Sequence, residues 1–176
     1  MWRQLASELA DRTRQRGGTV PPRNLIPKVF IGSSSEGLDV ARAIQSGFQY
    51  DNVTAKVWTD GVFQASKATI EDLEREIHTT DFGILVLTPD DKIESRSDTK
   101  MGPRDNVILE LGLLMGALGR DRTFAVHPRG KDIKIPTDLL GIKPVTYSVD
   151  PGIDLTVAMG PVNTELRKII AKLGPK

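Results

Sequence analysis

The sequence predicts an α/β fold with a doubly wound, mostly parallel sheet of five strands, preceded by a separate N-terminal helix. Short apolar runs alternate with amphipathic helical patterns along the chain, which indicates right-handed βαβ crossovers. The clearest apolar run, residues 82–87, contains no polar side chain, as expected of a strand that is buried on both faces of a parallel sheet. The composition, 39% hydrophobic and 27% charged, is that of a globular domain with a sizeable core.

The N-terminal segment divides into two parts. Apolar residues spaced i, i+3 and i+7 predict an amphipathic helix that ends near residue 16. A linker rich in glycine and proline follows over residues 17–27. Because a lone helix before such a linker has nothing of its own to pack against, we interpret residues 1–16 as the last helix of a domain that is missing from this chain. Residues 28–176 then form the core domain.

The core domain is expected to contain five strands, each a short run rich in apolar residues. These runs are residues 28–31, 55–58, 82–87, 123–126 and 145–147. Helical spacing of apolar residues predicts the intervening helices, of which one begins near Glu36 and another follows a candidate N-cap at Ser66. A last helix around Leu166 closes the chain. The polar stretch of residues 89–105 is predicted to be a mobile, solvated loop, with a lid over the cleft as the alternative.

Composition and charge exclude several classes of protein. The absence of cysteine excludes disulfides, thiolate metal sites and a cysteine nucleophile, and it fits the cytosol better than a secreted setting. The formal net charge of +1 gives no field that would attract nucleic acid or anionic lipid. His78 and His127 have no cluster of carboxylates beside them in the sequence, so no metal site is expected. We therefore expect a cytoplasmic protein without a nucleic-acid or membrane partner.

Ligands of doubly wound sheets bind beyond the carboxyl ends of the strands. This rule selects four loops, which are residues 32–36, 58–66, 88–105 and 127–131. In the second loop, Trp58 and Phe63 are predicted to offer an aromatic wall to a planar base, unless Trp58 is an ordinary core residue.

The first of these loops consists of small residues between a strand and a helix. Gly32, Ser33, Ser34 and Ser35 allow the backbone to approach a ligand, and the start of the following helix favours an anion such as a pyrophosphate. The segment matches neither a GxGxxG fingerprint nor a P-loop. A simple turn with a serine cap is the alternative interpretation.

The helix predicted for residues 106–119 is apolar nearly all round, and Glu110 is its only charged residue. An ionised carboxylate in such surroundings is costly unless it is paired or lies in a wet cleft. Its pKa should therefore rise, unless a nearby Arg104 reverses the shift. Asn106 lies one turn earlier and faces the same way. We interpret Glu110 as the candidate catalytic residue. The alternative is that it belongs to a thin stripe of helix residues that faces solvent.

Three glycines, Gly112, Gly116 and Gly119, form a seam of small residues along this same helix. Close packing against the sheet or against a partner is the interpretation that best explains them.

Four segments together resemble the TIR-like domain of bacterial anti-phage effectors that are activated by cyclic nucleotides, in the Pycsar and related systems. In order, they are VFIGSSSEG at 29–37, VWTDGVF at 57–63, DF at 81–82 and RDNVILELG at 104–112. The resemblance covers nearly all of residues 28–148, and the last segment is the most specific. It implies a flavodoxin-like TIR fold and an NAD glycohydrolase that splits NAD into nicotinamide and an ADP-ribose product.

The resemblance also implies roles for individual residues. Glu110 would be the essential glutamate, and NAD would be the substrate rather than a cofactor. The loop of residues 59–66 corresponds to the TIR BB loop, which borders the pocket and takes part in self-association. Residues 1–16 would end a sensor domain, absent here, that binds a cyclic mononucleotide. The predicted substrate-binding residues are Gly32, Ser33, Ser34, Ser35, Trp58, Gly61, Phe63, Arg104 and Asn106.

The chemistry of NAD agrees with a helix that offers a single glutamate. Ordinary glycosidases use two carboxylates, one of which protonates the leaving oxygen. The nicotinamide of NAD already leaves as a cationic group, so no general acid is needed. Two other functions stay open from the sequence: a TIR module that only assembles, and a nucleoside deoxyribosyltransferase or nucleotide N-glycosidase, which also uses a glutamate in a similar sheet.

Overall fold

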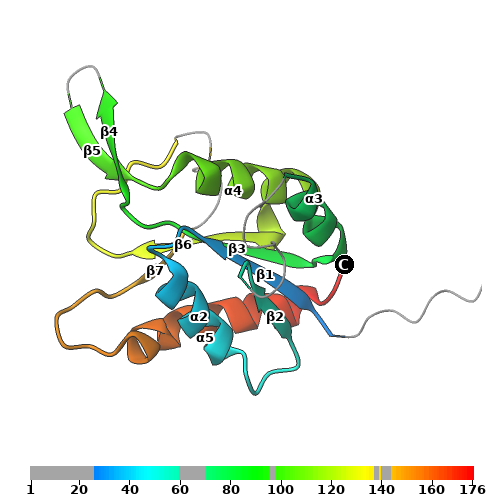
Figure 1. Cartoon of the computed structure of the whole chain (residues 1–176). Coiled ribbons are helices and arrows are strands. Elements are labelled where there is room, and N and C mark those ends of the chain that lie inside the picture. The colour runs from blue at the N-terminus through cyan, green and yellow to red at the C-terminus, as the bar shows by residue number, and fades with distance from the viewer. Residues whose placement is uncertain (1–25, 60–69, 96–97, 137–138, 140–143) are drawn as a thin grey trace, which may run out of the picture.

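The computed structural model describes residues 26–59, 70–95, 98–136, 139 and 144–176 (Figure 1). Several predictions lie outside this part of the chain. They concern the N-terminal helix, most of the linker, the candidate cap Ser66, and Gly61 and Phe63 in the loop after the second strand.

The described residues form a five-stranded sheet in which every neighbouring pair of strands is parallel. Its strands in spatial order are β2 (Thr54–Val57), β1 (Lys28–Ser33), β3 (Phe82–Val86), β6 (Thr123–Pro128) and β7 (Val145–Tyr147). The chain starts near the middle of the sheet, moves to one edge and then crosses to the other, which is the doubly wound topology. The predicted fold class is confirmed.

Helices cover both faces of the sheet, as Figure 1 shows. On one face lie α2 (Leu38–Gly47) and α5 (Leu155–Leu173), and on the other lie α3 (Ile70–Thr79) and α4 (Asp105–Leu118). A short 3₁₀ helix, η1 (Arg120–Arg122), connects α4 to β6. No helix among the described residues is long and apolar enough to cross a membrane.

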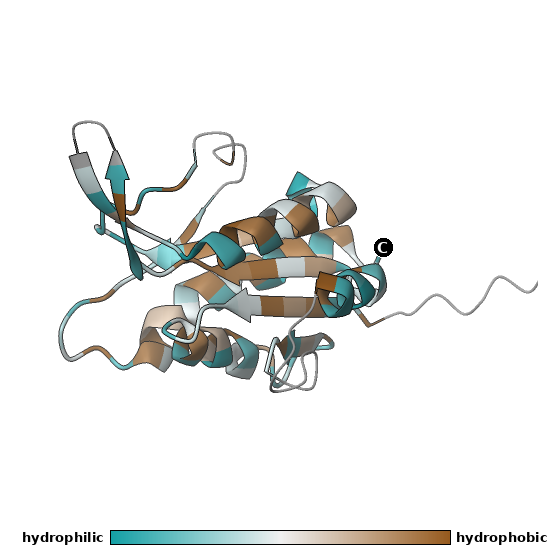
Figure 2. Ribbon diagram, turned by 45° about the horizontal axis from the view of Figure 1, so that its top comes forward, coloured by the Kyte–Doolittle hydropathy of each residue, from teal (hydrophilic) through white to brown (hydrophobic). Residues whose placement is uncertain are grey.

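Successive side chains of each strand point alternately into two separate hydrophobic cores, one on each face of the sheet. In β1, Val29 and Ile31 pack with α2 and α5, whereas Phe30 between them packs with α3 and α4. All five residues of β3 are buried, because this strand lies between β1 and β6 with helices on both sides. In Figure 2 the central strands and the helix sides that face them are accordingly coloured hydrophobic.

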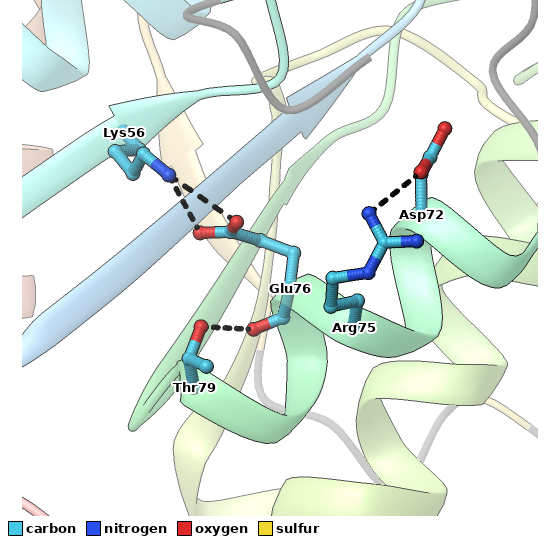
Figure 3. Close-up of polar contacts among 5 residues, drawn as sticks. All are labelled: Lys56, Asp72, Arg75, Glu76 and Thr79. Atoms are coloured by element: carbon cyan, nitrogen blue, oxygen red, sulfur yellow. Dashed lines mark hydrogen bonds and ion pairs between the residues drawn. The ribbon is translucent and has the colours of Figure 1, made fainter.

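An ion pair joins β2 to α3 on one of these faces (Figure 3). The ammonium of Lys56 lies 3.2 Å from a carboxylate oxygen of Glu76, and Asp72 and Arg75 form a second pair along the helix. Thr79 donates a hydrogen bond to the Glu76 backbone carbonyl at 3.0 Å. The Glu76 carboxylate thus has a cation beside it.

The prediction of a loop over residues 89–105 was wrong, whereas its mobility and the alternative of a lid stay predictions. The segment forms an antiparallel hairpin of β4 (Asp91–Ser95) and β5 (Asp98–Gly102), which stands out from the sheet in Figure 1. Its residues are largely hydrophilic, so the alternation of apolar and polar residues that marks a half-buried strand is weak. Backbone pairing, not burial, defines these two strands.

The predicted last helix around Leu166 is confirmed as α5, which begins at Leu155 and accommodates Pro161. The Asp154 carboxylate caps it by accepting from the Thr156 backbone N–H at 2.8 Å. One expectation needs correction, because the glycine seam of α4 does not pack on the sheet.

A β-carbon added to Gly112 or Gly116 would meet nothing within 4 Å. The buried face of α4 consists instead of Val107, Leu111, Leu114 and Leu118. The helix is therefore buried on one side only, and packing of the glycine seam against a partner stays a prediction.

Candidate active site at the carboxyl ends of the strands

Glu110 projects from the partly buried flank of α4 toward the end of β1. A β-carbon built on Gly32 would lie 3.2 Å from the Oε2 atom of Glu110, and 2.7 Å from the side chain of Leu85. Only a residue without a side chain therefore fits at position 32 without displacing its neighbours. The Glu110 carboxylate lies against the backbone at the carboxyl end of a central strand, where doubly wound folds bind ligands.

Burial raises the pKa of Glu110 to about 7. Removal of the carboxylate from water is the cause, and no cation among the described residues offsets it. Arg104, which precedes the helix, does not reverse the shift because its guanidinium pairs with Glu36 instead. A carboxyl group of this kind is populated in both protonation states near neutral pH, which is typical of functional sites.

The serines of the first loop differ in exposure. Ser33 and Ser34 are buried, whereas Ser35 is exposed and its hydroxyl donates to Glu36 at 3.2 Å. The indole N–H of Trp58 donates to the Ser33 hydroxyl at 3.0 Å. Trp58 is partly buried and packs against both cores, as expected of a core residue, while its role as an aromatic wall for a planar base stays a prediction.

The ion pair of Arg104 with Glu36 connects the start of α4 to the loop after β1. A hydrogen bond from the Glu36 backbone N–H, together with the Ser35 hydroxyl and Arg104, lowers the pKa of the Glu36 carboxyl. Asn106 is exposed in the first turn of α4. The structure thus brings Arg104 to Glu36 at one end of the serine loop and Glu110 to Gly32 at the other, while it leaves Asn106 exposed.

Sequence analysis missed a row of polar side chains that follows β3. The Thr88 hydroxyl donates to the Asp90 carboxylate at 2.8 Å and lies 3.0 Å from the Ser34 hydroxyl. The Ser34 hydroxyl in turn accepts from the Gly37 backbone N–H at 3.2 Å. The signal was present as Thr88-Pro89-Asp90 directly after the clearest strand, but Asp90 begins a run of charged residues that resembles a solvated loop.

Tyr147 and His127 lie at the ends of the next two strands. Burial, and then the negative charge of Asp90, raise the pKa of the Tyr147 hydroxyl. A ring nitrogen of His127 lies 3.0 Å from the Pro128 carbonyl oxygen, a contact within its own strand. Among the described residues, no three side chains of metal-ligand type gather into a site.

The site has two walls that meet over Gly32. The α4 wall carries one carboxylate with a raised pKa, and the other wall, formed by the end of β1 and the turn before α2, carries the serine hydroxyls. Such an arrangement can stabilise positive charge on one side while it holds polar groups of a ligand on the other. A separate surface hollow of about 380 Å³ lies between α2 and β2, but its lining contains no carboxylate.

Comparisons with known proteins point to one family. The family model described as "CAP12/Pycsar effector protein, TIR domain" matches residues 28–149. The chain is 44% identical to the Pycsar effector protein PaPycTIR of Pseudomonas aeruginosa, over all of this chain and 58% of that protein. It is 39% identical to the Pycsar effector protein BcPycTIR of Burkholderia cepacia, over 99% of this chain and 57% of that protein.

A more distant relative has a different name. The chain is 39% identical to CD-NTase-associated protein 12 of a Lachnospiraceae bacterium, over 81% of this chain and 44% of that protein. The chain therefore spans less than two thirds of the length of each of these relatives.

Proposed function

Since the chain belongs to the family of CAP12/Pycsar effector TIR domains, we propose that it is an NAD hydrolase that acts in bacterial antiviral defence. The reaction is the cleavage of NAD into nicotinamide and ADP-ribose. One observation carries the proposal, namely the Glu110 carboxylate, which faces the end of β1 and has a pKa of about 7.

In this mechanism Glu110 acts in its ionised form. The bond between the ribose C1′ atom and the nicotinamide nitrogen breaks, and its electron pair leaves with nicotinamide, which becomes neutral. The carboxylate stabilises the positive charge that develops on the ribose, or forms a transient ribosyl ester with it. Water then adds its hydroxyl to C1′ and releases a proton. No second carboxylate is required, because the leaving group needs no proton.

The remaining predicted site residues are proposed to bind the rest of NAD. Small side chains at Gly32, Ser33, Ser34 and Ser35 admit the substrate close to the backbone of the loop. Trp58 and Phe63 border the planar groups, and Gly61 belongs to the same loop. Arg104 supplies positive charge for the phosphates, and Asn106 lies one turn from Glu110 on the same helix.

Regulation is proposed to come from outside the described domain. A cyclic mononucleotide binds to a sensor domain that lies beyond this chain, and self-association through residues 59–66 then completes the active form. Activity of the chain alone should therefore rise more steeply than linearly with protein concentration.

The test is the release of nicotinamide from NAD, measured over a range of protein concentrations for the wild type and for Glu110→Gln. We expect the substitution to lower turnover by at least about 1,000-fold, because the neutral amide cannot stabilise a cation. Glu74→Gln, an exposed position on α3, is the matched control and should keep wild-type turnover.

Three outcomes have distinct meanings. Full activity of Glu110→Gln would refute the assignment of the catalytic residue. A wild type without turnover at every concentration would favour an assembly module. Preferential cleavage of deoxynucleosides in competition with NAD would favour a deoxyribosyltransferase or nucleotide N-glycosidase.

A further inference from the structure

Beyond the last paired residues of the sheet, side chains continue the connection between β1 and β3. The register of the two strands ends at the pair Ser33 and Val86. Farther on, the Ser34 hydroxyl lies 3.0 Å from the Thr88 hydroxyl, and Thr88 donates to Asp90 at 2.8 Å. The loop after β1 is thus attached to the end of β3 by hydroxyl groups where the backbone ladder no longer reaches.

The direction of these hydrogen bonds follows from the number of protons available. A hydroxyl has one hydrogen, and Thr88 gives its hydrogen to the Asp90 carboxylate, which can only accept when ionised. The hydrogen between the two hydroxyls therefore belongs to Ser34. The Ser34 oxygen accepts from the Gly37 backbone N–H at 3.2 Å. We call these four residues, Gly37, Ser34, Thr88 and Asp90, the Thr88 network.

The charge of Asp90 gives the network its polarity. Hydrogen bonds that end on an ionised group are stronger than those between neutral groups. The same charge lies near Tyr147, since burial and then Asp90 raise the pKa of the tyrosine hydroxyl. Every donor in the network points from the loop toward Asp90. Removal of one hydroxyl hydrogen therefore interrupts the whole series of hydrogen bonds.

The same network reaches the wall that carries Glu110. The backbone N–H of Asp90 donates to the carbonyl of Gly102 at 3.0 Å, at the base of the hairpin. Two residues after Gly102, Arg104 precedes α4 and pairs with Glu36, which belongs to the loop after β1. The contacts therefore connect the loop after β1 to the end of β3, to the base of the hairpin and to the start of α4.

On this geometry we propose that Thr88 and Asp90 are positioning residues, which hold the 33–37 loop in place for the substrate without touching the reacting atoms. The inference rests on the proposed function, because the substrate in question is NAD. Glu110 lies on α4 and is not a member of the Thr88 network, so loss of the network removes none of its hydrogen bonds. Loss of the network should therefore weaken the binding of NAD more than it slows the chemical step.

The test compares three variants of the full chain in a steady-state assay of nicotinamide release. Thr88→Val removes the hydroxyl at nearly constant volume, Thr88→Ser retains it, and Thr164→Val on α5 controls for the exchange of an exposed threonine. We expect Thr88→Val to raise KM for NAD by about tenfold with kcat within about twofold of wild type, the size of effect expected for one hydrogen bond to a charged group. Thr88→Ser should restore KM.

A second measurement does not depend on activity. The Gly37 amide donates to the Ser34 hydroxyl at the end of the network and also to the Ser34 backbone carbonyl, each at 3.2 Å. Because the first of these bonds depends on the network, hydrogen exchange of this amide should be faster in Thr88→Val than in the wild type and unchanged in Thr164→Val. If the wild type releases no nicotinamide, the proposed function fails and this readout alone decides whether Thr88 holds the loop.

Several results would overturn the proposal. One is a Thr88→Val variant with the KM, kcat and Gly37 exchange of the wild type. Another is a fall in kcat at unchanged KM, which would place Thr88 in the chemical step. A third is equal damage by Thr88→Ser and Thr88→Val, which would make the effect one of packing and not of the hydroxyl.

Discussion

Glu76 and Glu110 lie on the two helices that cover the same face of the sheet, and both side chains are partly buried. Glu76 has the ammonium of Lys56 at 3.2 Å. Glu110 has no cation partner among the described residues, and burial raises its pKa to about 7. A paired carboxylate of this kind links two elements of the fold, whereas an unpaired one retains a charge that a substrate can use.

The position of each glutamate accounts for the difference. Glu76 faces β2, where its carboxylate accepts hydrogen bonds from the Lys56 ammonium, which balances its charge. Glu110 faces the end of β1, where its carboxylate, with Leu85 and Phe30, packs into the place that a side chain at Gly32 would occupy. The comparison predicts that the site depends on the missing side chain at Gly32 as well as on the carboxylate itself.

The largest effect outside Glu110 itself should come from adding a side chain at position 32. The methyl group of Gly32→Ala would lie 3.2 Å from the carboxylate oxygen and 2.7 Å from buried Leu85, so one of them must move. We expect turnover of NAD to fall by about 100-fold, the cost of a displacement on the order of 1 Å at a reacting group. Steady-state nicotinamide release measures it.

Gly112→Ala provides the matched control for this substitution. Its methyl group meets nothing within 4 Å, and alanine favours the helix by up to about 1 kcal/mol. Turnover should stay within about twofold of wild type. Equal losses in the two variants would contradict the idea that Gly32 makes room for Glu110.

Exchange of each glutamate for glutamine should have a smaller effect, on the free energy of unfolding, with opposite signs at Glu110 and Glu76. The folded chain binds the Glu110 proton more tightly than the unfolded chain does, so stability falls as the pH rises from about 4.5 to about 7. Glu110→Gln should therefore raise the free energy of unfolding at pH 8, by at most about 3 kcal/mol. The gain should vanish near pH 4, where the wild-type carboxyl is neutral. Urea denaturation at both pH values measures it.

At Glu76 the same exchange should be slightly destabilising. Its partner Lys56 is substantially exposed, and ion pairs near the surface contribute less than about 1 kcal/mol. A stabilising effect of Glu76→Gln at pH 8, as large as that of Glu110→Gln, would remove the distinction between the two residues.

Much of the fold was predictable because a buried face of a strand or helix requires apolar residues at regular spacing in the sequence. The run at β3 has no polar side chain since both faces of this strand are covered, and the helices retain apolar residues at regular spacing. The hairpin of β4 and β5 was missed because its strands are held by backbone pairing and their residues show little regular spacing of apolar side chains. The expectation that the α4 glycines pack on the sheet was wrong because small residues indicate close packing only where another element lies opposite them; packing against a partner stays a prediction.

The candidate site was predictable only in part. Glu110 was recognisable as the one charge in an apolar helix, a local property of the sequence. Its proximity to Gly32, and that of Thr88 to Ser34, depends on strands that are neighbours in the sheet but distant in the chain. Such contacts follow from strand order and register, which no single segment contains.

The most direct measurement is the dependence of kcat/KM for NAD on pH, because it reports the ionisation of essential groups in the free protein. If the ionised Glu110 carboxylate performs the reaction, kcat/KM should be constant above a midpoint near pH 7 and fall about tenfold for each pH unit below it. A profile that stays flat down to pH 5 would contradict the account, since the essential carboxylate would then be an ordinary solvated one or another group altogether.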